Sequence, residues 1–265
     1  MHQLAVDFST ECDALNELLR EHGSAVFDIR TQFKQWSIND ILLHLHHWNI
    51  AAALAVFEPE AFENHKQRVI AYLGTGASLI DFDRQECGHE SGYELLESWR
   101  GFYTTMATRF AELDPKARAA WIGPDMSVRS SLSARLMESW AHAQAIYDVL
   151  GVERTLSDGI RHIAQIGINT FGWTFRNRQL AVPEAMPSVR LIAPSGARWE
   201  WNSDASNDVI EGAASEFCQV VTQTRHVADT ALAVSGAVAS QWMSMAQCFA
   251  GSPTDPPAPG TRFKV

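Results

Sequence analysis

Three histidines crowd one short segment of the chain, at His44, His46 and His47. Imidazole nitrogens commonly bind divalent transition metals, so this crowding directs attention to a metal site. Much later in the chain, Glu138 and His142 are spaced i,i+4, which places both side chains on one face of a helix. Two imidazoles and one carboxylate form a typical ligand set for a catalytic metal, with a fourth position left for water or substrate. These residue types therefore predict a metal site built from two helices.

The three histidines are not equivalent in their helical positions. At about 100° per residue, His44 lies at the edge of the apolar stripe, beside Trp48, whereas His46 points nearly the opposite way. His47 lies about one sixth of a turn from His44. His44 is therefore best placed to face the interior of a helical bundle, and His47 is second.

The helix that carries Glu138 and His142 is apolar on two sides. Trp140 belongs to its main apolar stripe, while the face of the Glu–His pair also holds Ala145 and Val149. A helix that is apolar on two sides is usually interior. Bundle cores are recurrent places for metal sites, so Glu138 and His142 can point into a bundle from one helix while His44 points in from another.

Other interpretations of the same residues stay open. An i,i+4 Glu–His pair also occurs as a surface contact, and a histidine at the edge of a core is often a hydrogen-bonded core residue. Closure of the fourth coordination position, for example by His47, would favour a structural metal over a catalytic one.

Weaker candidates lie elsewhere in the chain. Arg225 and His226 could bind an anionic substrate or be solvated, and Arg161 and His162 could face a cavity or water. Several tryptophans could line a pocket, although core packing is the default for aromatic side chains. They are Trp36, Trp48, Trp99, Trp140 and Trp173.

Composition excludes several classes of protein. The 265 residues are 46% hydrophobic and 20% charged, which is typical of a globular protein. The net charge of −10 disfavours a nucleic-acid partner, because an acidic surface repels phosphate backbones. No apolar run reaches the roughly 18 residues of a membrane helix, and the N-terminus lacks the pattern of a secretory signal. We therefore expect a cytoplasmic protein with no membrane partner.

Short motifs exclude further classes. No P-loop, no GxGxxG after a strand, no GxSxG and no HExxH is present, which argues against a nucleotide enzyme and an α/β-hydrolase. The four cysteines form no CxxC pair, so reduced and mostly buried thiols are expected. They are Cys12, Cys87, Cys218 and Cys248.

The pattern of apolar residues predicts a helical part followed by a mixed part. Gly74, Gly76 and Gly88 indicate a loop between the third and fourth helices, and another loop is expected around Gly123. Ser37 and Asp40 resemble a capping box, which places the start of the second helix. Helices are predicted over 7–22, 37–56, 60–73, 91–112, 130–150 and 157–172.

Beyond Pro183 and Pro187 the pattern changes to short strands and helices. A hairpin is predicted from Val189–Ala193 and Arg198–Trp201, because Pro-Ser-Gly separates these two runs. Further strands are predicted over Asp208–Glu211 and Leu232–Ser235, and helices over Ala213–Val227 and Ala239–Phe249. We thus expect a helical domain over 1–180, a small α/β domain over 185–250 and a Pro-rich tail over 252–265.

Three segments resemble one known family. QWSINDILLHLHHWN (35–49) resembles the Trp-Ser/Thr-x-x-Asp-x-x-x-His-Leu segment of the DinB-like superfamily, in its mycothiol-dependent maleylpyruvate isomerase branch. RLMESWAHAQAIYDVLG (135–151) resembles the second metal segment of that branch, and FCQVVTQTRHVADTALAVSG (217–236) resembles the C-terminal part of a metal-binding subfamily. His46 and His47 depart from the usual pattern, as do Gln144 and Ala145.

The resemblance implies a mainly α fold, with a DinB-type four-helix bundle followed by a small α/β domain similar to sterol-carrier proteins. It implies a divalent metal held by His44, Glu138 and His142, usually zinc, with Ni²⁺, Fe²⁺ or Mn²⁺ as alternatives. In the isomerase branch an arginine of the small domain contributes to the active site, and Arg225 is the candidate here for binding a substrate anion.

The resemblance and the metal segments together suggest an enzyme. We expect a metal-dependent reaction of a small electrophilic substrate with a low-molecular-weight thiol, as an S-transferase or a cis–trans isomerase. A hydrolase or lyase that uses a metal hydroxide, and a non-catalytic protein that binds a metal and a ligand, are the alternatives. A small molecule is the expected partner, and a homodimer is a further expectation.

Overall fold

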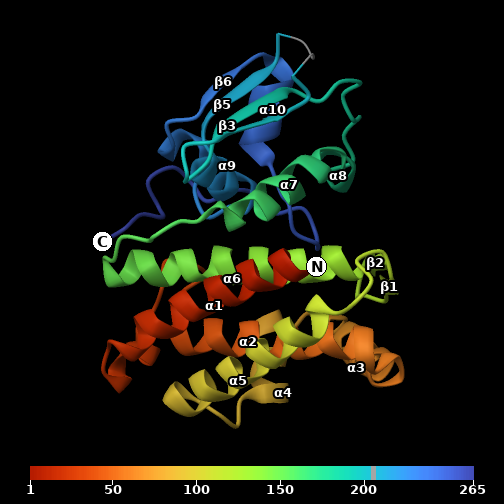
Figure 1. Ribbon diagram of the computed structural model, residues 1–265, viewed down its shortest axis with the longest axis vertical. Helices are drawn as coiled ribbons and strands as arrows, with labels where there is room; N and C mark the ends of the chain where they lie inside the picture. The colour runs from red at the N-terminus through yellow and green to blue at the C-terminus, as the bar shows by residue number, and fades with distance from the viewer. Residues whose placement is uncertain (204–206) are drawn as a thin grey trace. The chain divides into compact units, whose positions relative to one another are not determined.

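The computed structural model describes residues 1–203 and 207–265, which form two compact units, Met1–Val149 and Leu150–Val265 (Figure 1). The described residues are mainly helical, and a small sheet lies in the second unit. This confirms the predicted fold class, a helical bundle followed by a small α/β part. In the described part of the chain, no helix is both long enough and apolar enough to cross a membrane.

The first unit is built on four long helices. Helix α5 packs against both α1 and α2. Helix α6 joins the bundle through Cys12 of α1, whose Sγ lies 3.7 Å from Oγ of Ser139. The short helices α3 and α4 pack against α2. The bounds are α1 His2–Arg20, α2 Ile38–Phe57, α3 Pro59–Leu73, α4 Leu79–Cys87, α5 Gly92–Ala111 and α6 Val128–Leu150.

A capping box starts α2, as the sequence predicts. The Ser37 hydroxyl accepts a hydrogen bond from the Asp40 backbone N–H at 3.0 Å, and the Asp40 carboxylate accepts one from the Ser37 N–H at 2.9 Å. Two of the N–H groups that a helix start leaves without partners are thereby satisfied. The capping box fixes the residue at which α2 begins, the helix that carries His44.

The glycine-punctuated stretch after α3 is not the predicted loop, because it contains helix α4 (Leu79–Cys87). Ser78 caps this helix, since its hydroxyl accepts from the Asp81 N–H at 3.4 Å. Ile80 and Phe82 are buried against the rest of the unit. A helix this short is stabilised mainly by such tertiary burial, which a local pattern does not reveal.

Two smaller differences concern neighbouring segments. Helix α1 starts at His2, earlier than the predicted residue 7. The predicted loop around Gly123 is present, and it connects β1 (Arg118–Ala119) to the antiparallel β2 (Met126–Ser127), a strand pair that the sequence pattern does not predict.

The second unit holds a four-stranded sheet with the order β4-β3-β5-β6. The predicted hairpin is present as antiparallel β3 and β4, while β3 pairs parallel with β5, and β5 pairs antiparallel with β6. Helix α9 packs against the sheet and against α7, where a Cβ on Gly167 would lie 2.9 Å from a methyl group of Val221. The bounds are α7 Arg161–Asn169, α8 Phe171–Asn177, β3 Ser188–Ile192, β4 Arg198–Trp201, β5 Val209–Ala213, α9 Ala214–Val221, β6 Ala233–Ser235 and α10 Ala237–Met245.

The helices of the second unit are shorter than predicted. The predicted 157–172 helix is divided into a 3-10 turn at Asp158–Ile160, α7 and the start of α8. Helix α9 ends at Val221 rather than Val227, because Gln223 adopts a left-handed conformation with φ of 58°. Helix α10 ends at Met245, before the predicted Phe249. The tail is held by hydrogen bonds, among them one from the Gly260 N–H to the Asp229 carboxylate at 2.9 Å.

Candidate metal centre

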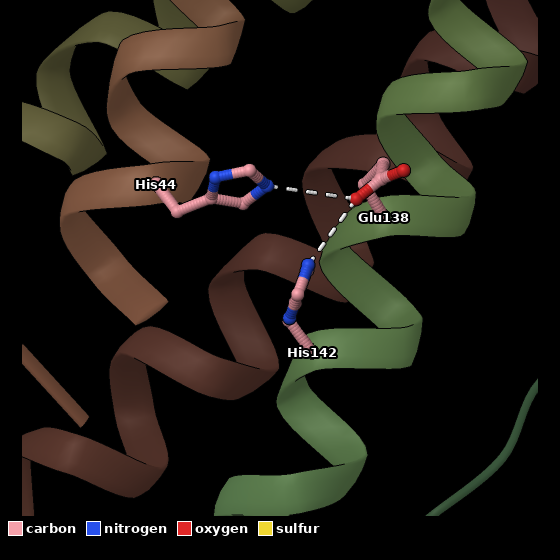
Figure 2. A group of neighbouring side chains, drawn as sticks. All are labelled: His44, Glu138 and His142. Carbon is pink, nitrogen blue, oxygen red and sulfur yellow. Dashed lines mark ion pairs between the residues drawn. The ribbon is translucent and has the colours of Figure 1, made fainter. Parts of the chain in front are cut away.

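His44, Glu138 and His142 come together in the first unit and are called the first histidine group. Each offers one possible ligand atom, and these atoms all lie within 4.8 Å of one another. Glu138 Oε2 lies 3.8 Å from His44 Nε2 and 3.2 Å from His142 Nε2 (Figure 2). Figure 2 shows His44 reaching from α2 toward the Glu–His pair of α6. The structure thus places the three residues singled out in the sequence around one point.

The members of the first histidine group differ in exposure. The side chains of His44 and His142 are 8% and 11% exposed, whereas 25% of the Glu138 side chain is exposed. The group is therefore buried on its imidazole side and reaches solvent at its carboxylate.

Aromatic rings hold the imidazole of His142 in place. The ring of Trp36 stacks on it, with centroids 5.9 Å apart and an interplanar angle of 7°. The ring of Phe33 meets it edge-on, at a centroid distance of 4.9 Å. Because both rings come from the segment that leads into α2, this segment fixes the ring plane of His142.

Asp83 of α4 orients His44. Its side chain is fully buried, and its Oδ2 lies 2.7 Å from His44 Nδ1. A carboxylate accepts the hydrogen bond, so Nδ1 of His44 carries a hydrogen. Nε2 is the nitrogen that faces the Glu138 carboxylate, at 3.8 Å. A carboxylate behind a histidine is the usual arrangement for metal-binding imidazoles, because it fixes the tautomer and the ring orientation.

The carboxylates of this region are held in the ionised form. Burial alone would raise the pKa of Asp83, but its hydrogen bonds with His44 and His47 outweigh burial and lower the pKa to about 2. Burial would likewise raise the pKa of Glu138, yet His142 and His44 lower it well below its ordinary value. The first histidine group therefore offers an anionic ligand at neutral pH.

The two imidazoles of the group respond in opposite directions. Burial would lower the pKa of His44, but Asp83 and Glu138 raise it above its ordinary value. Burial, together with the charge of His44, lowers the pKa of His142 despite its contact with Glu138. One imidazole thus favours a proton while the other favours its neutral form. A proton held among converging ligand atoms occupies the position that a metal cation would take.

Sequence reasoning missed two residues beside this centre. The sequence pattern predicts a loop where helix α4 lies, so it does not identify Asp83. Arg135 lies one turn before Glu138 on α6, and its charge favours the ionised form of that carboxylate. Its guanidinium is buried, and Nε donates to Asn49 Oδ1 at 3.2 Å. Arg135 could have been identified from the sequence, because it is a charged residue one turn from Glu138 on a helix that is predicted to be interior.

The other two histidines of α2 do not join the first histidine group. His46 packs edge-on against Phe102 of α5, with centroids 5.7 Å apart. His47 is buried, and its Nδ1 lies 2.7 Å from Asp83 Oδ1. It belongs to a separate cluster with His65 and Glu86. Closure of the first group by His47 is therefore not the arrangement in this structure.

The remaining candidates occupy varied positions. Arg225 lies in the turn after α9 rather than on the predicted helix, is half-buried, and its Nη1 donates to the Thr224 carbonyl at 2.9 Å. His226 acts as a cap, because its Nδ1 accepts from the Ala228 N–H at 3.0 Å. Arg161 lies near the ring of Trp199, and His162 is half-buried on α7.

The tryptophans and cysteines behave as packing residues. Trp99 and Trp140 are fully buried, while Trp36 and Trp48 lie beside the histidines of α2. Trp173 is half-buried on α8. The four cysteines, all among the described residues, form no disulfide, and burial raises the pKa of Cys12 well above its ordinary value and that of Cys87 to about 11. Such thiols are poor nucleophiles at neutral pH.

Comparisons with known proteins give one consistent result. The family model of the mycothiol maleylpyruvate isomerase N-terminal domain matches residues 8–147, the range that contains the first histidine group and Asp83. Uncharacterized proteins from two strains of Mycobacterium tuberculosis are each 31% identical over 247 residues, which cover 93% of this chain and 95% of the relative.

Two solved structures share the fold. Both are crystal structures of the mycothiol-dependent maleylpyruvate isomerase, and one of them is a histidine-to-alanine mutant. The mutant has a TM-score of 0.52 at 12% identity, and the other structure 0.50 at 14%. In each case the match covers 82% of this chain and 87% of the solved chain.

Proposed function

Since the chain belongs to the mycothiol maleylpyruvate isomerase N-terminal domain family, we propose that it is a metal-dependent enzyme that uses a low-molecular-weight thiol. The name of the family favours mycothiol as the thiol and a cis–trans isomerisation as the reaction. The substrate is a small electrophile with a carbon–carbon double bond. Cysteines that are not joined in disulfides are typical of a reducing compartment, which supports a cytoplasmic location.

The observation that carries this proposal is the convergence of ligand atoms in the first histidine group. His44, Glu138 and His142 would hold a divalent cation, for which a set of two imidazoles and one carboxylate suits zinc. The hydrogen bond from His44 Nδ1 to Asp83 leaves the right nitrogen available for that ion. The residues present therefore fit the metal.

A bound divalent cation with an open position lowers the pKa of a coordinated thiol, so that the thiolate is present at neutral pH. The chain itself supplies orientation: Asp83 holds His44, and Trp36 holds the ring of His142. The partly exposed Glu138 marks the side from which small molecules reach the centre.

The reaction class follows from the chemistry of a thiol and an activated double bond. The thiol sulfur adds to one alkene carbon and a proton adds to the other, so that a single bond replaces the double bond and can rotate. Elimination of the thiol and of that proton restores the alkene in the other geometry and returns the thiol unchanged. If elimination does not occur, the adduct is the product and the activity is that of an S-transferase.

Arg225 is the residue that we propose for binding a substrate carboxylate. The proposal rests on the resemblance of 217–236 to the C-terminal part of the family and on the chemistry of a guanidinium, which binds carboxylates through paired N–H donors. Its half-buried position in the turn after α9 is compatible with binding a small anion.

Turnover assays with the zinc-loaded protein test the proposal. Mycothiol and glutathione are supplied in turn with maleylpyruvate and with other cis-alkene acids, and products are separated by chromatography. We expect isomerisation that requires a thiol and disappears in His142→Ala but persists in His89→Ala, an exposed histidine. A fully zinc-loaded protein without thiol-dependent turnover across the panel would contradict the proposal.

A further inference from the structure

We propose that the first unit binds a second divalent cation through His47, His65 and Glu86, the second histidine group. These residues come from α2, α3 and α4, and their possible ligand atoms lie within 4.8 Å of one another. This proposal stands on its own geometry and does not depend on the proposed function.

The strongest observation is an unsatisfied nitrogen on His65. The residue is only 3% exposed, and its Nε2 is buried without a hydrogen-bond partner. Leaving a buried polar atom unpaired costs roughly 1–3 kcal/mol, so such an atom in a folded protein calls for an explanation. The neighbouring rings of Phe62, Phe82 and Trp48 offer apolar surroundings and no strong acceptor. A cation in contact with Nε2 satisfies this atom.

His47 is oriented in the same way as His44. Its Nδ1 lies 2.7 Å from Asp83 Oδ1, so the hydrogen is on Nδ1 and Nε2 has the free lone pair. Its ring meets that of His65 at a right angle, with centroids 5.0 Å apart. The carboxylate of Asp83 thus supports one histidine of each group, one with each oxygen, in the manner of a residue that supports metal ligands.

Glu86 completes the second group with a carboxylate. Its side chain is 20% exposed, and Oε2 accepts from Arg68 Nη2 at 2.8 Å. Because the Arg68 side chain is itself 54% exposed, it can move into solvent when a cation arrives. Two imidazole nitrogens and one carboxylate oxygen are a donor set for Zn²⁺, Co²⁺ or Ni²⁺ rather than for Mg²⁺ or Ca²⁺.

The test counts metal ions in the full-length protein. Metal is removed with a chelator, and Co²⁺ is then titrated while its visible d–d absorption is recorded; equilibrium dialysis with Zn²⁺ provides a second count. We expect two equivalents per chain. Glu86→Gln and His65→Gln should each lower the affinity of the second histidine group for its cation at least tenfold and leave binding at the first group unchanged. His142→Ala should weaken binding at the first group and leave the second group unchanged.

Matched variants separate a built site from surface binding. Glu63→Gln changes an exposed carboxylate on α3, and His89→Gln changes an exposed histidine. Both should retain two equivalents. Glu86→Gln leaves the core intact because its side chain is partly exposed, so it keeps the test valid if His65→Gln fails to fold. A single equivalent that persists in Glu86→Gln, or a second equivalent that persists in Glu86→Gln and in folded His65→Gln, would overturn the proposal.

Discussion

The two histidine groups of the first unit share one carboxylate but differ in what competes for their ligands. Asp83 bonds His44 of the first group and His47 of the second, each at 2.7 Å. In the first group, Glu138 meets the two imidazoles directly. In the second, Glu86 is paired with Arg68. A cation must displace this guanidinium from the second group, so we infer that the first group binds its ion more tightly.

This difference shows how one helix can serve two centres. His44 and His47 are spaced i,i+3 on α2, so they lie close enough for one buried carboxylate to reach both. The selectivity between the centres then comes from the third side chain and its neighbours. Arg135 supports the ionised form of Glu138 by its charge, whereas Arg68 binds the ligand oxygen of Glu86 itself.

The largest expected effect concerns the shared carboxylate. Asp83→Asn should lower the affinity for each of the two cations by about 10–100-fold, which is the usual cost of losing a residue that orients a metal ligand. Titration with Co²⁺ measures both steps. Asp81→Asn, on the exposed side of α4, is the matched control and should change neither. A loss confined to one equivalent would break the view that Asp83 supports both groups.

Acid unfolding of the metal-free protein gives the next largest effect. The folded-state pKa of Asp83 is about 2, below its ordinary value of 3.8, so the carboxylate stabilises the fold above pH 3.8 and loses this contribution as the pH falls to about 2. The expected contribution is about 2 kcal/mol. Urea unfolding should show the free-energy gap between the unaltered protein and Asp83→Asn closing over this pH range. A gap that is the same at pH 5 and pH 2 would contradict it.

Substitutions in the second unit should change the binding of the substrate and leave the binding of both cations unchanged. Arg225→Ala should raise KM for a carboxylate substrate about tenfold, which corresponds to the loss of one charged hydrogen bond, and should leave metal content unchanged. Arg225→Lys should raise KM less than Arg225→Ala does, because a lysine keeps the positive charge but lacks the paired donors. Arg190→Ala removes an exposed arginine of β3 as the control. An unchanged KM in Arg225→Ala would remove Arg225 from the proposed site.

The smallest effect sharpens the comparison between the groups. Arg68→Gln frees Glu86 from an exposed ion pair worth at most about 1 kcal/mol, so the second cation should bind up to about fivefold more tightly. The first cation should not respond. Arg100→Gln, an exposed arginine of α5, is the control. Weaker binding of the second cation in Arg68→Gln would contradict the competition inferred for this group.

The sequence reveals those features that depend on local spacing. The capping box of Ser37 and Asp40 placed the start of α2, and helical periodicity selected His44, Glu138 and His142, which the structure brings together. Each of these signals comes from residues of a single helix, in which about 3.6 residues per turn determine the side on which each side chain lies.

The residues that were missed depend on tertiary contacts. Helix α4 is stabilised by the tertiary burial of Ile80 and Phe82, which the sequence does not reveal. Its segment lies between glycines and is therefore predicted as a loop, so Asp83 is not identified. His65 and Glu86 lie on separate helices whose packing brings them to His47, and no spacing in the chain encodes that approach. The end of α9 depends on the left-handed Gln223, a residue with no strong preference for that conformation.

The central claim is that His44, Glu138 and His142 hold a metal ion, and it can be measured directly. Elemental mass spectrometry gives the metal content per chain of the purified protein, of Glu86→Gln and of the double variant Glu86→Gln/His142→Ala. In Glu86→Gln, where the second group is disabled, we expect close to one zinc or other divalent ion per chain, and in the double variant we expect almost none. No metal in Glu86→Gln after reconstitution with zinc, or equal metal in both variants, would contradict the assignment of this centre.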